Sequence, residues 1–292
     1  MKIALFGRPF DPAFFDNLRL LIKILEQRTD SFIIYENLYH FIRDYIVFEK
    51  PVSVVASGSK PPDDTYCMIS LGGDGTLLDT ITMLRNTGIP VLGINTGRLG
   101  FLSAISTEET AYAASALISG DYELDRRTML QLANPKGLFG SFNYALNELT
   151  VIKRDNTTMI RISAYVDDLF LNTYWADGLI VSTPTGSTGY SLSCGGPIIS
   201  PESSNFVITP IATHNLTVRP IVIADNCIVK LSVSGRTQDC LVLLDSRSRQ
   251  LSEATELIIK KAPFHINLVC IGQKDFYKTI RNKLAWGLDK RN

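Results

Sequence analysis

The stretch Leu71-Gly72-Gly73-Asp74-Gly75-Thr76-Leu77-Leu78 decides the fold of the first part of the chain. It follows the apolar run Tyr66 to Leu71, which predicts a buried strand, and it leads into a helical pattern of apolar residues between Leu77 and Leu84. A strand that turns through glycines into a helix is typical of an open α/β sheet. In such sheets, ligands bind beyond the carboxyl ends of the strands, where helix N-termini offer N–H groups to anions.

The glycines of this turn favour phosphate binding, because they permit positive φ values and let a phosphate approach the backbone closely. Asp74 is harder to explain, since a carboxylate repels a phosphate at the same turn unless it binds a metal or accepts a proton from a hydroxyl. The structural alternative is a tight turn in which Asp74 caps the helix. The turn matches neither G-x-x-x-x-G-K-[ST] nor G-x-G-x-x-G, which disfavours a standard P-loop protein or a Rossmann dehydrogenase.

Two halves of the chain differ in periodicity. In the first 120 residues, apolar patterns predict strands at 3–6, 52–56, 66–71 and 91–94, and helices at 14–25, 77–84 and 107–119. Strands that alternate with helices imply a parallel sheet covered on both faces. After Tyr122 the runs at 160–166, 227–233, 241–244, 257–259 and 266–271 are strand-like, and Asp167-Asp168 predicts a turn.

These patterns predict an α/β plus all-β protein. We expect an N-terminal Rossmann-like α/β domain with a parallel sheet over residues 1–121, and a C-terminal β-rich sandwich domain over 122–272. The last segment, 273–292, returns to a helical period, and we expect it to pack back on the first domain.

Composition narrows the class of protein. Lys plus Arg and Asp plus Glu both total 29, so we expect neither nucleic acid nor a membrane as partner. The five scattered cysteines contain no C-x-x-C pair and the three histidines lie far apart, so we predict reduced thiols and no protein metal site. The first apolar run is too short for a signal peptide and no apolar run reaches about 18 residues, which predicts a cytoplasmic protein.

Three further segments carry amides, carboxylates and hydroxyls. Gly93-Ile94-Asn95-Thr96-Gly97-Arg98-Leu99-Gly100-Phe101-Leu102 follows a strand, and Phe101 is suited either to a base or to the core. Asn147-Glu148 places a carboxylate between leucines, where burial is costly unless the group is paired. The run from Asp177 to Ile198 contains Ser182-Thr183-Pro184-Thr185-Gly186-Ser187-Thr188-Gly189-Tyr190, whose N–H and hydroxyl groups suit a polyhydroxyl ligand with a pyrophosphate. Its alternative is a capped helix with Ser and Thr as turn residues.

Together these segments resemble the NAD kinase family. Gly72 to Thr76 alone is similar to a superfamily that also holds diacylglycerol-type lipid kinases and, more distantly, phosphofructokinases. The other segments resemble the family patterns N-x-G-x-L-G-F, Asn-Glu and D-G-x-x-x-S-T-P-T-G-S-T-[AG]-Y, and His214 in His214-Asn215-Leu216 matches a family position near the ligand. The resemblance covers residues 70 to 220.

The resemblance implies a role for each matching residue. Asp74 is the general base, and Gly72, Gly73, Gly75 and Thr76 face the phosphates of the donor. Phe101 lies at the adenine site, Asn147 contacts adenine, Glu148 lies near the ribose hydroxyls, and Asp177 holds the nicotinamide end. The full set expected to bind NAD is Asp74, Gly75, Asn95, Phe101, Asn147, Glu148, Asp177, Thr185, Thr188, Gly189, Tyr190, Ser193 and His214.

The sequence departs from the family pattern at three positions. Trp175 stands where many bacterial members carry a basic residue two positions before the Asp of D-G, so the preference between NAD and NADH is open. Cys194 stands where Ala is common. At Leu244-Asp245-Ser246 the family usually shows Asp-Gly, which leaves the role of Asp245 open.

The resemblance also implies the reaction, which is transfer of the γ-phosphoryl group of ATP to the adenosine 2′-hydroxyl of NAD to give NADP. It implies Mg²⁺ or another divalent cation carried by ATP, and a homodimer or homotetramer. ATP and polyphosphate are both open as donors. The alternatives are a lipid kinase of the same superfamily, a non-catalytic NAD-binding regulator, and a structural β-protein with an α/β appendage.

Overall fold

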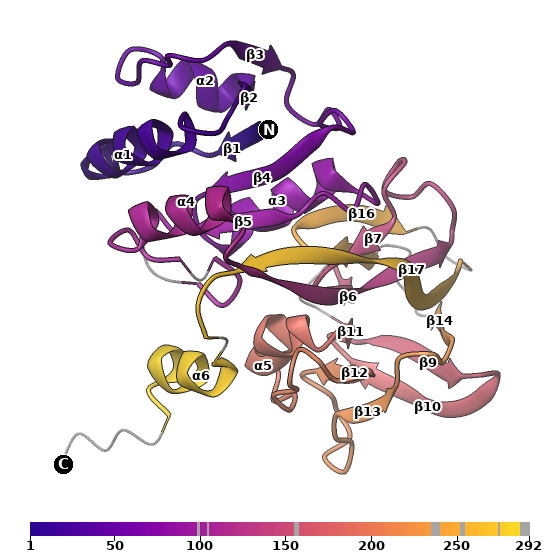
Figure 1. Ribbon diagram of the computed structural model, residues 1–292. Coiled ribbons are helices and arrows are strands. Elements are labelled where there is room, and N and C mark those ends of the chain that lie inside the picture. The colour runs from indigo at the N-terminus through magenta and orange to yellow at the C-terminus, as the bar shows by residue number, and fades with distance from the viewer. Residues whose placement is uncertain are drawn as a thin grey trace. The chain divides into compact units, whose positions relative to one another are not determined.

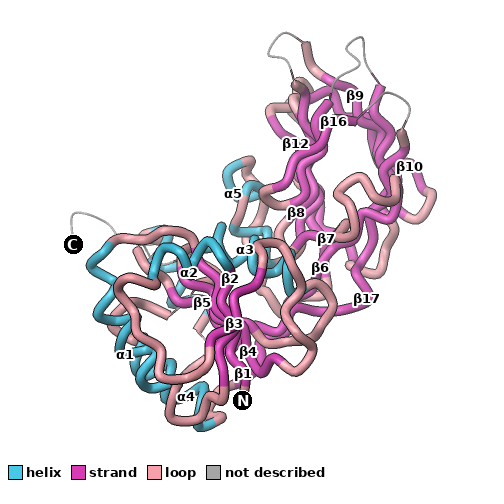
Figure 2. The backbone as a smooth tube through the Cα atoms, turned by 90° about the horizontal axis from the view of Figure 1, so that it is seen from above, coloured by secondary structure: helices cyan, strands magenta, loops and turns pink. Residues whose placement is uncertain are grey.

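The computed structural model describes residues 1–97, 100–103, 105–154, 158–234, 240–251, 255–273 and 275–286 (Figures 1 and 2). The chain forms two compact units. Unit 1 comprises Met1–Arg126 and Ile266–Asn292, and unit 2 comprises Arg127–His265. The boundaries fall inside two strands, β6 (Glu123–Asn134) and β17 (Glu256–Cys270). Each unit is described by itself below.

Unit 1 is an open α/β sheet. Its strands stand in the order β5-β4-β1-β2-β3, all neighbouring pairs being parallel, and Leu268 at the end of β17 pairs in parallel with Val91 of β5. The elements are β1 (Lys2–Gly7), η1 (Pro12–Phe14), α1 (Phe15–Leu25), β2 (Ser31–Tyr35), α2 (Glu36–Ile42), β3 (Val52–Val55), β4 (Thr65–Leu71), α3 (Asp74–Leu84), β5 (Val91–Ile94), α4 (Thr110–Ser119) and α6 (Phe276–Leu284).

Helices cover both faces of this sheet. Apolar side chains of α1, α2 and α4 share one buried cluster with Ile3, Leu5 and Ile69 of the strands, and α1 packs against α4. Successive side chains of a strand point to opposite faces, so Ser70 points away from that cluster. Thr80 of α3 donates a hydrogen bond to the Ser70 hydroxyl (2.9 Å). Helix α3 therefore lies on the opposite face from α1, α2 and α4.

The order of the strands contains one reversal of direction. From β1 the chain passes through β2 to β3, and it then returns to the other side of β1 to form β4 and β5. The carboxyl ends of β1 and β4, at Gly7 and Leu71, are neighbours in register. This is the switch point of the sheet, which is where open α/β sheets bind ligands.

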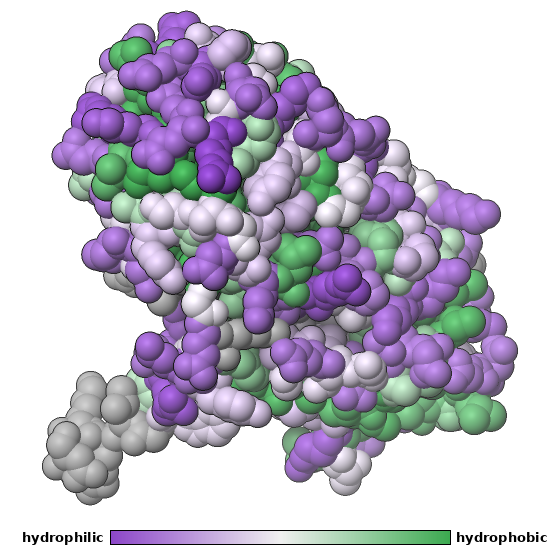
Figure 3. Space-filling view, in the orientation of Figure 1, coloured by the Kyte–Doolittle hydropathy of each residue, from purple (hydrophilic) through white to green (hydrophobic). Residues whose placement is uncertain are grey.

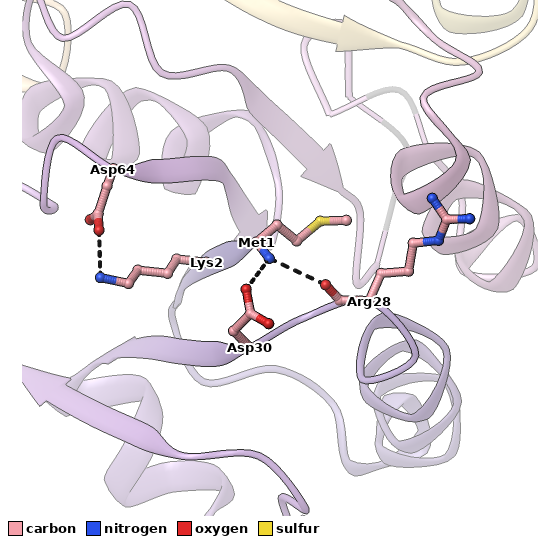
Figure 4. Close-up of polar contacts among 5 residues, drawn as sticks. All are labelled: Met1, Lys2, Arg28, Asp30 and Asp64. Carbon is pink, nitrogen blue, oxygen red and sulfur yellow. Dashed lines mark hydrogen bonds and ion pairs between the residues drawn. The ribbon is translucent and has the colours of Figure 1, made fainter.

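Ion pairs fix the amino ends of the strands, where β1 begins (Figure 4). The Met1 amine contacts the Asp30 carboxylate and the Arg28 carbonyl oxygen (3.3 Å), and the Lys2 ammonium pairs with Asp64 at 2.5 Å. The Met1 amine also holds the pKa of Asp30 below its usual value. Both carboxylates are solvent-exposed, so these pairs fix the strand end and contribute little stability.

Unit 2 consists of two antiparallel sheets. One has the order β13-β12-β11-β8-β15-β16, and the other contains β10-β9-β14-β17, with β6 pairing β17 and β7. The further elements are β7 (Tyr144–Ala145), β8 (Glu148–Lys153), β9 (Ile160–Val166), β10 (Leu169–Ala176), β11 (Gly178–Ser182), η2 (Thr185–Thr188), α5 (Tyr190–Ser193), β12 (Asn205–Ile211), β13 (Ile221–Ala224), β14 (Val229–Ser234), β15 (Cys240–Leu244) and β16 (Arg247–Leu251).

One core joins the two sheets of unit 2. Buried Ile162 and Leu231 of one sheet share a cluster with Val151, Val181 and Val242 of the other. Alternation of buried and exposed residues along β9 gives this sandwich its inner and outer faces. The predicted fold class, α/β followed by a β-rich sandwich, is confirmed.

Several of the local predictions differ from the structure. The helix expected from Thr107 begins at Thr110, because a turn precedes it in which the Glu109 carboxylate accepts a hydrogen bond from the Ser106 N–H (3.0 Å). The two runs at 257–259 and 266–271 are parts of one long strand, β17. The predicted Asp167-Asp168 turn is present, with both residues at positive φ, 49° and 65°.

Candidate active site

The Asp74 carboxylate holds a loop of unit 1. Its Oδ2 accepts a hydrogen bond from the N–H of Phe101 (2.8 Å), and its Oδ1 accepts from the N–H groups of Leu102 and Ser103 (3.0 Å each). Asp74 is the first residue of α3 and Gly73 is the N-cap, so Asp74 does not cap the helix. The carboxylate therefore joins the glycine-rich turn to the segment that follows β5.

Gly100 makes this arrangement possible. A Cβ at this position would lie 1.8 Å from Asp74 Oδ1 and 2.5 Å from its Cγ, so the carboxylate could not keep its position. Only a residue without a side chain lets the loop approach the carboxylate closely enough for three hydrogen bonds.

The turn after β4 has two kinds of glycine. Gly72 has φ +148°, and a Cβ there would lie 2.4 Å from the hydroxyl oxygen of buried Thr76, so this glycine is required by the turn itself. Gly73 and Gly75 have nothing within 4 Å of a built Cβ. The backbone at the start of α3 is thus open to a ligand, and it carries the partial positive charge of a helix N-terminus.

Asn95 lies in the turn between β5 and this loop. Its side chain is 1% exposed, and its Oδ1 accepts a hydrogen bond from the Gly97 N–H (2.7 Å). The Phe101 side chain is half-buried, so it is neither a core residue nor a fully exposed ring. Arg98 and Leu99 of the quoted segment lie outside the described residues.

A cavity of about 330 Å³ lies beside α3 in the same unit. Its walls come from the end of β1 and the residues after it, from α2, from the residues after β3 and from α3. Arg8 forms an ion pair with Asp79 there.

Asp245 plays the same part in unit 2 that Asp74 plays in unit 1. Its Oδ2 accepts a hydrogen bond from the Leu146 N–H (2.9 Å), and its Oδ1 accepts from the N–H groups of Asn147 (2.8 Å) and Glu148 (3.2 Å). Its own N–H donates to the Glu148 carbonyl (3.0 Å). Asp245 adopts φ 51°, a left-handed conformation that Asp tolerates better than most residues with a side chain.

Glu148 is a half-buried residue near this carboxylate, and its Oε2 is buried. Burial is the main cause that raises its pKa to about 8; the negative charge of Asp245 adds to the effect, and a backbone hydrogen bond from Tyr190 opposes it. Burial likewise raises the pKa of Asp245, against the three N–H donors that lower it. Among the described residues, Glu148 Oε2 and Asn147 Oδ1 are buried and have no hydrogen-bond partner. Both side chains thus offer polar atoms to a ligand.

The hydroxyl-rich segment packs directly on this pair. The Asn147 carbonyl accepts from the Thr183 N–H (2.8 Å), and a Cβ on Gly186 would lie 2.1 Å from that carbonyl oxygen. A Cβ on Gly189 would lie 3.0 Å from Glu148 Oε2. Glycines are therefore needed where this segment crosses Asn147-Glu148.

The remaining candidate residues of unit 2 differ in exposure. Thr185 is buried and accepts a hydrogen bond from the Arg127 guanidinium (3.3 Å), whereas Thr188 is half-buried and Tyr190 and Ser193 are exposed. Burial is the main cause that raises the pKa of Tyr190. Tyr190 and Ser193 therefore present their side chains to solvent.

Asp177 forms an ion pair with Lys153 at 2.7 Å. The exposed His214 ring contacts the exposed Trp175 ring edge-on, with centroids 6.0 Å apart, and the backbone N–H of His214 donates to the Trp175 carbonyl (2.8 Å). The Arg161 guanidinium lies over the Trp175 ring, with its Cζ 4.5 Å from the ring centroid. A positive charge is thus present beside Trp175, supplied by the neighbouring strand.

Among the described residues, no group of three or more His, Cys, Asp or Glu side chains is placed to hold a metal ion. In the same residues, no helix has the length and apolar character that crossing a bilayer requires.

Comparisons with known proteins identify the family. Residues 57–122 match the model of the ATP-NAD kinase N-terminal domain, and residues 146–271 match that of the C-terminal domain. The NAD kinase of Cytophaga hutchinsonii is 44% identical over 292 residues, and that of Flavobacterium psychrophilum is 45% identical over 294 residues, with all of each chain covered. The chain belongs to the NAD kinase family.

Solved structures of NAD kinases share the fold. A yeast NADH kinase complexed with NADH superimposes with a TM-score of 0.84 at 23% identity, covering 99% of this chain and 89% of that chain. An NAD kinase from Archaeoglobus fulgidus in complex with ATP gives a TM-score of 0.75 at 24% identity, covering 98% and 99%. Family membership makes the chain a phosphotransferase, and the family resemblance drawn from the sequence is confirmed.

The structure of this NAD kinase family member groups the candidate residues within each unit. In unit 1, Asp74, Gly100 and Phe101 meet at the turn after β4. In unit 2, Asn147, Glu148 and the segment around Gly186 to Tyr190 form a second group. Sequence reasoning left the role of Asp245 open. The structure shows it holding Asn147-Glu148, and the signal available in the sequence was its match to the Asp of the family's Asp-Gly pair.

Proposed function

We propose that the chain transfers the γ-phosphoryl group of ATP to the 2′-hydroxyl of the adenosine ribose of NAD, giving NADP, with Asp74 as general base. The observation that carries the proposal is the fixed Asp74 carboxylate at an open, glycine-lined helix N-terminus. Phosphoryl transfer depends mainly on positioning and charge stabilisation, because the protein has little covalent chemistry to perform. A carboxylate held by backbone N–H groups meets the demand for positioning.

The Asp74 carboxylate has an acceptor site left for the proton of the 2′-hydroxyl. An ionised carboxylate offers about four lone-pair sites on its two oxygens. Oδ1 accepts two backbone hydrogen bonds and Oδ2 accepts one, so Oδ2 retains an acceptor site. The 2′-hydroxyl donates its hydrogen bond to Oδ2, and the proton passes to this oxygen as the ribose oxygen attacks the γ-phosphorus. The bond between the γ-phosphorus and the bridging oxygen breaks in the same transfer, and ADP leaves with its electron pair.

The donor phosphates contact the backbone at Gly72, Gly73 and Gly75, and Thr76 supports the turn. The open space at Gly73 and Gly75 supports this assignment, since phosphate oxygens need unobstructed N–H groups. ATP brings Mg²⁺ or another divalent cation, because this ion is bound mainly by phosphate oxygens and water with few protein carboxylates.

NAD contacts the remaining candidate residues, which are Asn95, Phe101, Asn147, Glu148, Asp177, Thr185, Thr188, Gly189, Tyr190, Ser193 and His214. Support comes from the unpartnered Asn147 Oδ1 and Glu148 Oε2. At neutral pH the raised pKa of Glu148 favours the protonated acid, which both donates and accepts hydrogen bonds, as a ribose hydroxyl does.

The enzyme self-associates as a homodimer or homotetramer and acts in the cytoplasm. Edge strand β10 supports self-association, because its Leu169 and Phe170 side chains are 75% and 61% exposed, and Figure 3 shows hydrophobic surface along the β10 and β13 side of unit 2. Edges of this kind are pairing surfaces unless they are covered. All five cysteines lie in the described residues and none forms a disulfide, which supports a reducing compartment.

The test is NADP formation from ATP, Mg²⁺ and NAD by the wild type, by Asp74→Asn, and by Asp44→Asn as a control at an exposed position of the same unit. General-base catalysis contributes about 10²–10⁴-fold, so Asp74→Asn should lose at least about 10²-fold in kcat while still binding NAD. A near-normal rate would remove Asp74 from the base role. A wild type that folds and binds NAD but makes no NADP from ATP or polyphosphate would favour the regulator or lipid-kinase readings.

A further inference from the structure

An ion pair in unit 2 includes the residue expected to hold the nicotinamide end of NAD. The Lys153 ammonium lies 2.7 Å from Asp177 Oδ1, and the two side chains are 16% and 32% exposed. Their backbones are joined as well, since the Lys153 N–H donates to the Asp177 carbonyl (2.9 Å). On its other side, the Asp177 N–H donates to the Ile211 carbonyl (2.9 Å). Both partners of the ion pair are therefore held where β10 passes into β11.

Asp177 lies beside the residues that carry the unpartnered polar atoms of the proposed site. Burial is the main cause that raises the pKa of Tyr190, and the neighbouring Cys194 thiol and the charge of Asp177 add to it. The Tyr190 backbone in turn forms a hydrogen bond with Glu148. A ligand bound at Glu148 and Tyr190 therefore also experiences the charges of Asp177 and Lys153.

The carboxyl groups of this region are compensated. Lys153 neutralises Asp177. Burial, and secondarily the charge of Asp245, raises the pKa of Glu148 to about 8, so Glu148 is neutral at pH 7. The Arg247 guanidinium offsets part of the Asp245 charge. These groups consequently present little net negative charge to a ligand.

A further positive charge lies on the neighbouring strand. Arg161 of β9 pairs in register with Trp175 of β10, and its Cζ lies 4.5 Å from the centroid of the Trp175 ring. Trp175 precedes Asp177 by two residues, which is about 7 Å of extended chain. This distance is within the Debye length at physiological salt, about 8 Å. Arg161 therefore adds to the positive potential at Asp177.

Oxidised and reduced NAD differ in charge at the ring that Asp177 is expected to hold. The nicotinamide of NAD⁺ is positively charged and that of NADH is neutral, whereas the rest of the molecule is the same. A carboxylate without a partner would favour NAD⁺ by Coulomb attraction. A carboxylate that an ammonium already neutralises gives little such preference.

We propose that Lys153 determines the redox preference of the acceptor site, and that by neutralising Asp177 it makes NADH a substrate as well as NAD⁺. The inference rests on the proposed kinase function for the identity of the acceptor. The 2′-hydroxyl of NADH attacks the γ-phosphorus and gives its proton to Asp74. The bond from the γ-phosphorus to the bridging oxygen breaks, and the products are NADPH and ADP. The nicotinamide keeps its redox state throughout.

Lys153→Met tests the proposal, because it removes the ammonium and keeps most of the length of the side chain. The Asp177 side chain is partly exposed, so its carboxylate remains hydrated and charged in this variant. Lys153→Arg restores the positive charge. Lys230→Met is the matched control, since Lys230 pairs with Asp168 elsewhere in the same unit. Isothermal titration calorimetry of the full chain with NAD⁺ and with NADH measures both Kd values for each protein.

We expect the wild type, Lys153→Arg and Lys230→Met to bind NAD⁺ and NADH with similar Kd values. Lys153→Met should favour NAD⁺ over NADH by about fivefold, which is the upper effect of a partly exposed ion pair. A purely structural role of Lys153 would weaken both forms equally, and an unchanged ratio of the two Kd values would overturn the proposal. So would a wild type that binds NAD⁺ more than about tenfold tighter than NADH.

Measuring NADP and NADPH formation from ATP on the same proteins separates this inference from the proposed function. A Kd ratio that shifts in Lys153→Met, without formation of either product, would retain the role of Lys153 in binding and refute the kinase reaction. Product formation with a Kd ratio insensitive to Lys153→Met would support the kinase reaction and refute the role of Lys153.

Discussion

Glu148→Gln should abolish a pH dependence of stability that the wild type carries in unit 2. Glutamine has the shape of the protonated acid and does not titrate. The pKa of Glu148 is about 8 in the folded chain against 4.5 for the ordinary group, chiefly because of burial and secondarily because of the Asp245 charge. The variant therefore isolates the contribution of a single carboxyl group.

The sign and size of the effect follow from linkage. Below pH 4.5 the group is protonated in both states and contributes no difference. Between pH 4.5 and about 8 the unfolded chain has lost the proton while the folded chain keeps it, so the free energy of unfolding falls as pH rises, by about 1.4 kcal/mol per pH unit. The full window corresponds to a loss of at most about 5 kcal/mol, which levels off above pH 8.

The measurement is urea unfolding at intervals from pH 5 to pH 9, followed by fluorescence of Trp175 in unit 2. A Trp286→Phe background removes the other tryptophan of the chain. Glu202→Gln, at an exposed position of the same unit, serves as control. The stability of Glu148→Gln relative to wild type should rise steadily with pH. A difference that stays constant from pH 5 to pH 9 would show that Glu148 ionises freely in the folded chain and would refute the reasoning.

Two further changes test the carboxylates that hold backbone loops. Gly100→Ala places a Cβ 1.8 Å from Asp74 Oδ1, and because a displacement of about 1 Å costs on the order of 10²-fold in rate, NADP formation should fall by about that factor while the circular dichroism spectrum is unchanged. Gly97→Ala, with nothing within 4 Å of a built Cβ, is the control, and equal rates for the two variants would contradict the role of Gly100. Asp245→Ala leaves the N–H groups of Leu146, Asn147 and Glu148 without their acceptor. At about 1–3 kcal/mol for each unsatisfied group, and with relief of the repulsion on Glu148 as a partial offset, urea unfolding should show a loss of about 3 kcal/mol. A change below about 0.5 kcal/mol would mean that water replaces the carboxylate.

The order of α/β and β-rich parts was predictable, because hydrophobic periodicity records which faces of an element are buried. The long strand β17 was not, since Lys260, Lys261 and Pro263 interrupt its apolar pattern and a proline in a strand removes a hydrogen-bond donor. Helix α2 (Glu36–Ile42) and strand β2 (Ser31–Tyr35) were missed as well. They adjoin without a break, so neither offers a window long enough to show its own period.

The candidate site was predictable as a set of motifs and not as an arrangement. The sequence shows Asp74 in a glycine turn, but its partners at 101–103 come 27 to 29 residues later. For Asp245 the separation from Leu146 is 99 residues. Hydrogen bonds that backbone N–H groups donate to a carboxylate leave no trace in the identity of the donors, because nearly every residue type has that group. The cavity beside α3 is likewise formed by segments that only the sheet brings together.

Because Asp74 and Asp245 accept hydrogen bonds from peptide N–H groups and not from side chains, these bonds place no demand on the side chains of the donors. Residues 101, 147 and 148, which are not buried, can exchange their side chains to suit a ligand without loosening either loop, provided that none becomes proline, which has no N–H. The tolerance is wide for these three donors, and it is narrow for the buried donors Leu102, Ser103 and Leu146, for the two aspartates and for Gly100. A chain built this way can retune its ligand preference by single substitutions while the framework of the site stays fixed.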